Sequence, residues 1–481
     1  MSRPVLGIDQ GTSGTTALVV DPDRGVLGAA TVAVRPRYGP AGTVEVDPQE
    51  LFGSVVEAGR RALTEAGEPV AAVGLANQGE TVLAWDPVSG IPFTDAVVWQ
   101  DRRAQEICDE LTDAADGLRQ LTGLPLDPYF AAPKMAWLRR HRTRAGVVTT
   151  SDAWLVHQLT GAFVTDAATA SRTMLLDLDA VDWSGEALEA FDLAGEPLPE
   201  IVDADQPVGT TDVFGPALPV TGLLVDQQAA LLAQHCLEPG AAKCTYGTGA
   251  FVLANAGSAP VRSKGGLVAC VAWRLRGATS YCLDGQVYTV GSAVRWLADL
   301  GVVSGPEDLD RLGGEAPDAG GVTFVPAFAG LAAPTWRGDA RAQIGGLGLG
   351  VTRAHVVRAL VDGIAAQVVE LTEAMSADLG VPIRALRVDG GLSRSRVLLQ
   401  IQADLLQRPV EVYPSPEATA LGAAAVARMG LEPGTTIPEA TGAWQPAAVY
   451  EPRISADEAE HRLGTHRDVV RRLLGETGGF A

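Results

Sequence analysis

The chain has 481 residues with 58 acidic and 37 basic side chains, so its formal net charge is −21 and its isoelectric point is near 4.7. Only three of the basic residues are lysines, and no lysine and arginine cluster offsets the acidity. Long-range electrostatics therefore argue against nucleic acid or an anionic membrane as the main partner. The length favours two or three domains, and 47% apolar with 20% charged residues is typical of a folded globular protein.

Membrane, disulfide and zinc proteins are also disfavoured. Asp9 interrupts the first apolar run, where a signal peptide would be uniformly apolar, and no apolar stretch is long enough to span a bilayer. The five cysteines form no C-x-x-C pair, and the six histidines are scattered. We therefore expect a soluble cytoplasmic protein with reduced thiols, which could form a homo-oligomer.

The N-terminal segment alternates short apolar runs with turns. Residues 5–8 and 17–20 are predicted strands, joined by a glycine-, threonine- and serine-rich turn over residues 9–16. A second turn at residues 21–25 leads into a strand over 26–34. This pattern predicts an antiparallel meander.

A helix and a buried strand follow the meander. Asp47 is the predicted N-cap, Pro48 occupies the first helical position, and apolar residues recur at helical spacing. Residues 71–76 then form a predicted strand that ends at Asn77-Gln78-Gly79-Glu80. The order of these elements predicts an α/β fold.

The same arrangement returns after residue 220. A strand at 222–225 ends at Asp226 and precedes a helix at 227–235, and strands at 243–246 and 251–254 flank Gly247-Thr248-Gly249. This second strand–turn–strand unit resembles the first across more than 200 residues, which indicates two related lobes. We place the boundary near residue 235, giving domains 1–235 and 236–481.

The C-terminal part contains one long predicted helix and one more glycine turn. Thr352 is the predicted N-cap of an amphipathic helix that Gly380 and Pro382 end. The strand at 386–388 then leads into Asp389-Gly390-Gly391. Glycine turns after strands suggest a nucleotide site.

Two common phosphate-binding motifs are absent. A P-loop requires Gly-Lys-Ser/Thr, and none of the three lysines follows a glycine. The dinucleotide fingerprint requires a glycine five residues after the first, and those positions are Val252, Val351 and Arg353.

Two facing glycine and threonine hairpins remain as the alternative. Their backbone N–H groups, with the hydroxyls of Thr12, Ser13 and Thr248, can converge on a triphosphate. Asp9 lies at the strand end beside the first hairpin, where a carboxylate can hold Mg²⁺ directly or through water. A solvated hairpin is the simpler interpretation of Asp9–Thr12 alone, but the matching second turn favours a shared nucleotide site.

An ordered set of motifs resembles the FGGY carbohydrate kinases, and within them the glycerol kinases. The likeness runs from about residue 5 to about residue 430. The motifs are Asp9-Gln10-Gly11-Thr12, Asn77-Gln78, Val98-Trp99-Gln100-Asp101-Arg102-Arg103, Asp127-Pro128-Tyr129-Phe130, Ala170-Ser171-Arg172-Thr173-Met174, Asp226-Gln227-Gln228, Thr245-Tyr246-Gly247-Thr248-Gly249, Arg387-Val388-Asp389-Gly390-Gly391 and Thr419-Ala420-Leu421-Gly422. The resemblance implies two ribonuclease-H/actin-like lobes with ATP and a polyol meeting in the interdomain cleft.

The resemblance also implies residue roles. Asp226 would be the general base that accepts the proton of the attacking hydroxyl, although local sequence also suits a helix N-cap there. The implied polyol-binding residues are Gly79, Glu80, Trp99, Tyr129, Asp226, Gln227 and Phe251. The implied ATP-binding residues are Thr12, Ser13, Gly14, Thr248, Gly291, Arg295, Gly391 and Ser395.

Departures from the family pattern bear on the substrate. Glycerol kinases have an arginine where this chain has Gly79, so charge-assisted hydrogen bonds worth about 1.5–3 kcal/mol each are lost and space for a longer polyol is expected. A second family arginine is Thr16 here, and a different sequence at 212–216 replaces the loop that binds an inhibitory sugar bisphosphate in some relatives.

The leading hypothesis is ATP- and Mg²⁺-dependent phosphorylation of a primary hydroxyl of glycerol or a closely related polyol. A tetritol, a pentitol or a ketose such as xylulose is the nearest alternative, because of Gly79. A non-catalytic actin-like ATP-binding protein is a remote alternative, which the predicted polyol residues disfavour.

Overall fold

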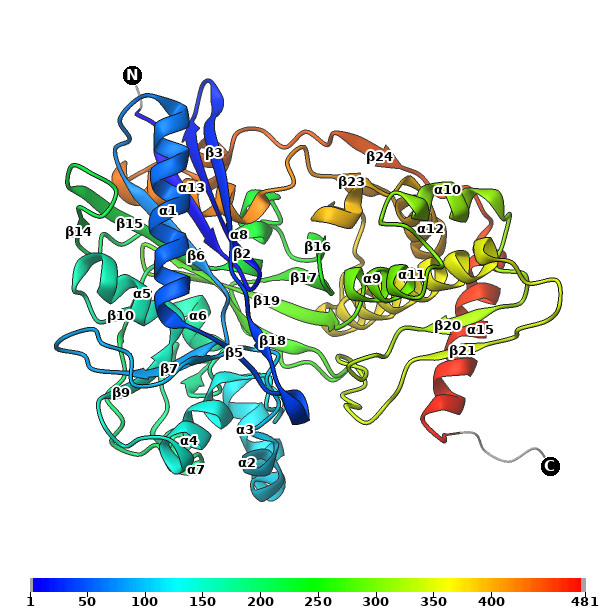
Figure 1. Cartoon of the computed structure of the whole chain (residues 1–481), viewed down its shortest axis with the longest axis horizontal. Coiled ribbons are helices and arrows are strands. Elements are labelled where there is room, and N and C mark those ends of the chain that lie inside the picture. Colours follow the sequence, from blue (N-terminus) through cyan, green and yellow to red (C-terminus); the bar gives the residue numbers. More distant parts are fainter. Residues whose placement is uncertain (1–2, 477–481) are drawn as a thin grey trace.

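The protein, described over residues 3–476 by a computed structural model, consists of two halves that are each built on a mixed β-sheet (Figure 1). In Figure 1 the blue-to-cyan first half lies on the left, and most of the second half lies on the right. Within residues 3–476, no helix is both long and apolar enough to cross a bilayer.

The first half contains a six-stranded sheet with the order β14-β15-β6-β1-β2-β3. Its central strand β1 runs antiparallel to β2 and parallel to β6. This confirms the predicted meander. The strands are β1 (Val5–Gln10), β2 (Gly14–Asp21), β3 (Gly25–Ala33), β6 (Val73–Asn77), β14 (Thr210–Thr211) and β15 (Leu218–Val225).

The second half repeats this topology in a seven-stranded sheet with the order β18-β19-β17-β16-β22-β23-β24. Here β16 runs antiparallel to β17 and parallel to β22, as β1 does with β2 and β6. The repeated order confirms the predicted pair of ribonuclease-H/actin-like lobes. The strands are β16 (Ala242–Tyr246), β17 (Ala250–Gly257), β18 (Val268–Leu275), β19 (Ala278–Val287), β22 (Leu386–Asp389), β23 (Val410–Val412) and β24 (Ala448–Tyr450).

Smaller sheets elaborate both halves. One has the order β4-β5-β8-β7-β9, and three are two-stranded. Their strands are β4 (Arg37–Tyr38), β5 (Val44–Val46), β7 (Val82–Trp85), β8 (Ala96–Val97), β9 (Val147–Thr150), β10 (Val164–Asp166), β11 (Leu176–Asp177), β12 (Asp182–Trp183), β13 (Glu200–Val202), β20 (Thr323–Val325) and β21 (Gln343–Gly345).

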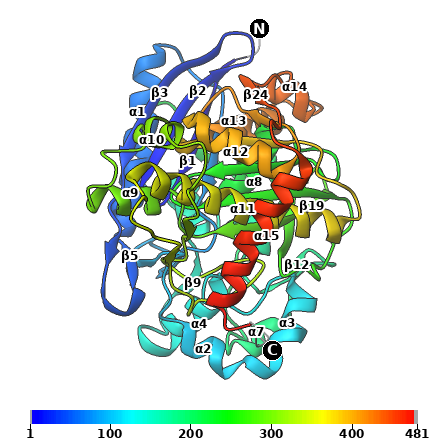
Figure 2. The same ribbon diagram turned by 90° about the vertical axis from the view of Figure 1, so that its right-hand side faces the viewer.

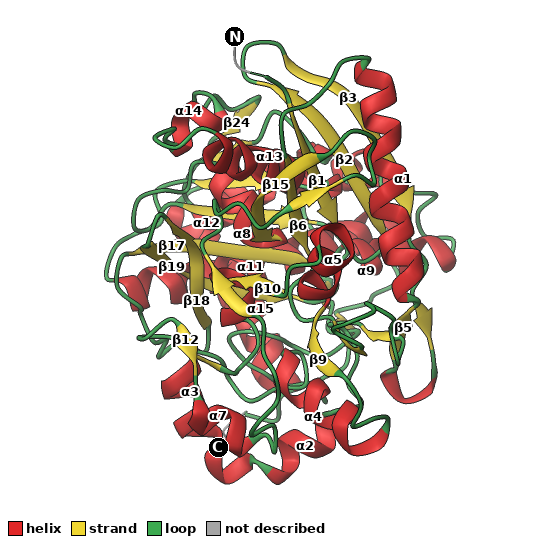
Figure 3. Ribbon diagram, turned by 90° about the vertical axis from the view of Figure 1, so that its left-hand side faces the viewer, coloured by secondary structure: helices red, strands yellow, loops and turns green. Residues whose placement is uncertain are grey.

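The helix predicted after Asp47 is α1 (Pro48–Ala66), and the Asp47 carboxylate accepts a hydrogen bond from the backbone N–H of Gln49. Its buried stripe packs on β2 and β3 (Figure 3). The other helices of the first half are α2 (Gln105–Glu110), α3 (Ala115–Thr122), α4 (Ala131–His141), α5 (Ser151–Thr160), α6 (Ala167–Ser171), α7 (Gly185–Ala190) and α8 (Asp226–Ala233).

The long C-terminal helix is α11 (Arg353–Leu379). A capping box between Thr352 and His355 starts it, and Gly380 in the left-handed conformation ends it. The C-terminal helix α15 (Ala456–Leu473) packs against α11 and α12 from outside (Figure 2). The remaining helices are α9 (Gly291–Asp299), α10 (Asp308–Glu315), α12 (Arg396–Leu406), α13 (Ala418–Leu431) and α14 (Ile437–Thr441).

Helices α8 and α13 join the two sheets. Helix α13 packs on β1, β6 and β15 of the first sheet, and α8 packs on β16, β17 and β18 of the second. The two helices approach closely, because a Cβ added at Gly422 would lie 2.1 Å from the carbonyl oxygen of Ala229. The start of α8, where Asp226 lies, is therefore at the junction of the two lobes.

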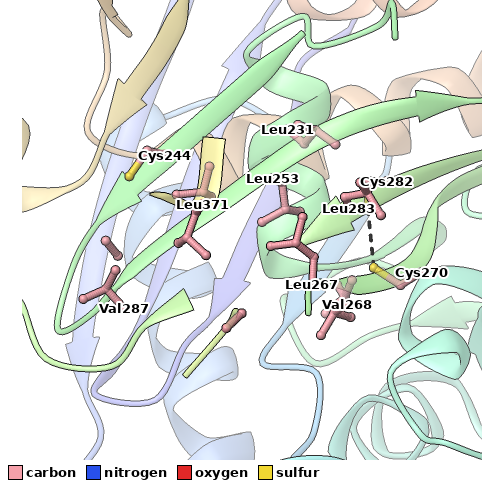
Figure 4. Packing of buried hydrophobic residues seen from close by; sticks show 14 of the residues in the cluster. Leu231, Cys244, Leu253, Leu267, Val268, Cys270, Cys282, Leu283, Val287 and Leu371 are labelled. Atoms are coloured by element: carbon pink, nitrogen blue, oxygen red, sulfur yellow. Dashed lines mark hydrogen bonds between the residues drawn. The ribbon is translucent and has the colours of Figure 1, made fainter. Parts of the chain in front are cut away.

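The largest apolar core within residues 3–476 covers the second sheet (Figure 4) and extends into the first half as far as β7 and α4. Leu231 of α8, Leu253 of β17 and Leu371 of α11 all belong to it. Cys270 and Cys282 face each other across β18 and β19 with their Sγ atoms 3.5 Å apart, and all five cysteines are free and buried. The core fixes the strands whose ends carry the candidate site.

Candidate active site

The first glycine and threonine turn connects β1 to β2. The N–H of Gly11 donates to the carbonyl of Gly14 at 3.0 Å and closes the turn, which also contains Thr12 and Ser13. The Ser13 side chain is exposed. Thr12 is tied to the first half by two hydrogen bonds, because its hydroxyl donates to Gln78 Oε1 at 3.2 Å and accepts from Trp99 Nε1 at 2.7 Å.

The second turn connects β16 to β17 in the matching place. The N–H of Gly247 donates to the carbonyl of Gly249 at 2.8 Å, and the N–H of Gly291 donates to the carbonyl of Gly247 at 3.1 Å. A Cβ at Gly291 would lie 2.6 Å from that carbonyl oxygen. Glycine is thus required for α9 to begin against the turn.

A cavity of about 720 Å³ opens beside the second turn. Such a volume lies within the range of small-molecule and cofactor sites. Five of the eight predicted ATP residues line it: Thr248, Gly291, Arg295, Gly391 and Ser395. The other three, Thr12, Ser13 and Gly14, lie at the first turn instead.

Two of the cavity side chains, Ser395 and Arg295, differ in their surroundings. The Ser395 hydroxyl donates to Asp310 Oδ1 at 2.7 Å and accepts from the N–H of Leu398 as the N-cap of α12. Arg295 of α9 lines the cavity, and its side chain is exposed to solvent.

The predicted aromatic residues of the polyol site come together from three separate segments. The Trp99 ring lies 5.6 Å from the Tyr129 ring and 5.9 Å from the Phe251 ring, both in edge-to-face geometry. Trp99 also donates to Thr12 of the first turn. Trp99, Tyr129 and Phe251 form an aromatic wall, which Trp99 connects directly to the predicted phosphate site.

Asp226 is the first residue of α8, after Val225 in the cap position. Its Oδ1 accepts from the N–H of Gln227 at 2.7 Å, so the carboxylate does not cap the helix in the usual way. Burial and then the nearby charge of Glu80 raise the pKa of Asp226 to about 6. A carboxylate with this pKa is ionised at neutral pH and is basic enough to accept a proton.

Gln227 leads to a partly buried chain of polar groups. Its Oε1 accepts from Lys243 Nζ at 2.5 Å, and Lys243 also donates to the Thr245 hydroxyl at 2.9 Å. Thr245 in turn donates to Asp389 Oδ1 at 2.6 Å. Lys243 is fully buried, and its charge opposes the rise in the pKa of both Asp226 and Asp389.

Asp9 lies in an acidic environment at the end of β1. Burial, followed by the charges of Asp226, Glu417 and Asp389, holds its pKa well above the usual range. Its Oδ1 is buried without a hydrogen-bond partner among the described residues. A buried, unpaired carboxylate oxygen among other carboxylates suits a divalent cation.

No group of three or more His, Cys, Asp and Glu side chains within residues 3–476 is arranged to hold a metal ion. Mg²⁺ commonly binds through one or two carboxylates, with water and substrate phosphates completing its shell. The single orphaned oxygen of Asp9 fits that mode of binding.

Glu80 is buried and paired. Its Oε1 accepts from Arg172 Nε at 2.6 Å, and Arg172 Nη1 donates to Asp284 Oδ2 at 2.6 Å. Burial raises the pKa of Glu80, and the Arg172 charge opposes that rise. The Glu80 carboxylate is therefore held beside the aromatic wall by a cation.

The expected free space beside Gly79 is absent, so that prediction was wrong. A Cβ at position 79 would lie 2.9 Å from Cγ2 of Val225 and 3.6 Å from Cγ of Arg172. Both neighbours are buried. Their side chains therefore occupy the space directly at Gly79.

Sequence reasoning missed four residues of the site. Arg172 was noted only as part of a motif, and Asp284, Lys243 and Lys134 received no role. Lys134 is fully buried and donates to the carbonyls of Pro128, Tyr129 and Phe130, which fixes the loop that carries Tyr129. The scarcity of lysine was a usable signal, since two of only three lysines are buried here.

Comparison with known proteins identifies the family. Residues 4–233 match the N-terminal domain of the FGGY family of carbohydrate kinases, and residues 242–431 match its C-terminal domain. A glycerol kinase of Alkalilimnicola ehrlichii is 43% identical to the chain, over 98% of this chain and 99% of that protein.

Solved structures agree with this assignment. The Plasmodium falciparum glycerol kinase with ADP superposes with a TM-score of 0.90 at 29% identity, covering 98% of this chain and 99% of that one. A structure described as a xyloylose kinase from Brucella ovis has a TM-score of 0.86 at 25% identity, covering 98% and 99% of the two chains. The chain therefore belongs to the FGGY family of carbohydrate kinases and is an ATP-dependent kinase.

Proposed function

We propose that this enzyme transfers the γ-phosphoryl group of ATP to a primary hydroxyl of glycerol, with Mg²⁺ as cofactor. The observation that carries the proposal is the convergence of Trp99, Tyr129 and Phe251 beside Thr12 of the first turn. An apolar wall next to a hydroxyl-lined turn suits a small polyol whose carbon face packs on rings and whose end hydroxyl points to phosphate.

Glycerol is favoured over a longer polyol by the packing beside Gly79. Val225 and Arg172 lie 2.9 Å and 3.6 Å from a Cβ placed at Gly79, so the space directly at this position is filled by protein, which supports the smaller substrate. The relatives support the same choice, because the chain is 43% identical to a curated glycerol kinase, and among solved structures it is 29% identical to a glycerol kinase and 25% identical to the protein described as a xyloylose kinase.

Asp226 has the role of general base in the proposed mechanism. Its carboxylate accepts the proton of the attacking hydroxyl, and the N–H of Gln227 fixes the orientation of its Oδ1. Glu80 and Gln227 orient the polyol, while Trp99 and Phe251 exclude water from its carbon face.

The nucleotide is proposed to lie across the two turns. Thr12, Ser13, Gly14 and Thr248 surround its phosphates, and Gly291, Arg295, Gly391 and Ser395 line the cavity for ribose and adenine. Mg²⁺, held at Asp9 directly or through water, would neutralise phosphate charge. Because Asp9 offers a single orphaned oxygen, apo protein is expected to hold Mg²⁺ weakly until nucleotide supplies further oxygens.

A panel of substrates tests the proposal. ADP release is measured with glycerol, erythritol, the threitols, the pentitols and xylulose, and glycerol is expected to give the highest kcat/KM. A tetritol, pentitol or xylulose with a higher kcat/KM would contradict glycerol as the substrate. ATP binding without turnover of any of them would support a non-catalytic protein.

Asp226→Asn tests the base within the same assay. The variant is expected to lose phosphoryl transfer while still binding ATP, and Asp116→Asn on the exposed face of α3 is the matched control. Full activity of Asp226→Asn would refute the assignment.

A further inference from the structure

The only buried ion pairs that connect the predicted polyol site to the second sheet, within residues 3–476, involve Arg172. The side chains of Arg172, Glu80 and Asp284 are 5%, 6% and 2% exposed. Glu80 follows β6 and Arg172 follows α6 in the first half, whereas Asp284 lies in β19 of the second half. One guanidinium thus connects an acid from each lobe.

The site is built to accommodate this guanidinium. The Arg172 stem passes beside Gly79, because a Cβ there would lie 3.6 Å from Cγ of Arg172, in ordinary van der Waals contact. The Arg172 Cζ atom lies 5.9 Å from the centroid of the Tyr129 ring, so the guanidinium borders the aromatic wall.

Asp284 is held in turn by the second sheet. Gln286 Nε2 donates to Asp284 Oδ2 at 3.1 Å, the same oxygen that accepts from Arg172. Gln286 is the register partner of Phe251 in the β17–β19 pair, and Phe251 belongs to the aromatic wall. The second lobe therefore contributes both an apolar and a charged contact to the region around Glu80.

Burying three charges is costly unless each is paired with good geometry. Removing Asp284 would leave Arg172 with Glu80 as its one anionic partner and free the guanidinium to turn. Glu80 would then keep its charge but lose its fixed position.

We propose that Arg172 is a positioning residue that holds Glu80 for the polyol and that Asp284, from the second lobe, locks Arg172 in place. The inference rests on the proposed function, because it assigns Glu80 to polyol binding. It follows that the second lobe, through Asp284, helps to set the position of a polyol-binding group of the first lobe.

The test is kinetic and uses the full chain. Asp284→Asn keeps the size of the side chain and removes the charge, and Arg172→Lys keeps a charge but cannot bridge both acids. Each variant is expected to raise the KM for glycerol about ten-fold or more, as expected for a lost charge-assisted hydrogen bond. The KM for ATP is expected to remain within about two-fold, because the proposed nucleotide cavity does not include these residues.

Asp205→Asn is the matched control. Asp205 is a buried acid of the first half paired with Arg276 of the second half at 3.2 Å. Arg276 lies just before β19, which begins at Ala278. At a rise of about 3.3 Å per residue, Ala278 and Asp284 are about 20 Å apart along this strand. This control breaks a bridge between the halves without touching the pocket, so the KM for glycerol is expected to stay unchanged.

The outcomes separate the two proposals. An unchanged glycerol KM in Asp284→Asn, a parallel rise in the ATP KM, or an equal effect of Asp205→Asn would overturn the inference alone. Absence of glycerol turnover by the unaltered chain would overturn the proposed function, and the inference with it. If the unaltered chain prefers another polyol, the same KM comparison with that polyol decides the inference.

Discussion

Replacing Gly79 by alanine should damage the enzyme through packing and leave its substrate preference unchanged. The new Cβ would lie 2.9 Å from Val225 Cγ2, whereas ordinary contacts between carbon atoms are about 3.5–4.0 Å. One of the two groups must therefore move by about 0.5–1 Å. Overpacking of this kind costs about 1–3 kcal/mol.

Displacement of Val225 should also change the position of the proposed catalytic base, Asp226. Val225 directly precedes Asp226, so movement of its backbone shifts the carboxylate at the start of α8. If the whole cost appeared in the transition state, kcat/KM would fall about 5- to 150-fold, at about 1.4 kcal/mol for each factor of ten. The loss should be equal for every polyol, because the contact is with protein and not with substrate.

A double-mutant cycle with Val225→Ala measures this contact. Val225→Ala alone removes two buried methyl groups and should destabilise the protein by about 2 kcal/mol. It also removes Cγ2, so Gly79→Ala should cost about 1–3 kcal/mol less in that background. The four proteins are compared by urea midpoint and by kcat/KM for glycerol and erythritol.

Gly53→Ala is the control for the glycine-to-alanine change itself. Gly53 is exposed on α1, and a Cβ there meets no atom within 4 Å. Alanine should stabilise that helix by about 0.5–1 kcal/mol. The packing argument fails if Gly79→Ala behaves like Gly53→Ala, if the two costs simply add, or if only erythritol turnover changes.

Three further predictions concern charge. The pKa of Asp226 is raised to about 6, so its base form predominates above pH 6. Below this pH, kcat/KM should fall about ten-fold per pH unit. A flat profile down to pH 5 would contradict the assignment of Asp226 as the base. Lys243→Met removes the cation that opposes the rise in the pKa of Asp226, so the acid limb of the pH profile should move to higher pH. An acid limb that stays in place or moves to lower pH would exclude this effect of Lys243 on Asp226. Asp9→Asn should raise the Mg²⁺ concentration needed for half-maximal turnover at least several-fold, and an unchanged Mg²⁺ titration would remove Asp9 from the metal site.

Local features of the fold could be predicted from the sequence. The start of α1 at Pro48 and its cap at Asp47 follow from the preferences of two neighbouring residues. The two glycine turns mark the strand ends because backbone hairpins need little beyond their own residues. The helix after Asp226 was also predicted, although it ends at Ala233, two residues before the expected position.

Contacts between distant residues could not be predicted in the same way. Arg172 pairs with Asp284 across 112 positions, and neither residue has a local feature that specifies the other. The packing around Gly79 could not be predicted for the same reason. A missing side chain was interpreted as empty space, but Val225, which is 146 positions away by its number, fills that space from another strand.

The net charge of −21 opposes the binding of a triphosphate, so the groups that compensate the phosphate charge must lie at the site itself. The sequence alone suggested that backbone amides, hydroxyls and Mg²⁺ must compensate the phosphates without a P-loop lysine. Lys243 changes that view, because it is buried one strand from Asp389 and opposes the charges of Asp389 and Asp226. Its donors are nevertheless directed to Gln227 and Thr245, so it stabilises the protein's own acids and does not replace a phosphate ligand. The charge of the nucleotide must then be met by the turn amides and by Mg²⁺ at Asp9, whose Oδ1 is buried without a hydrogen-bond partner among the described residues.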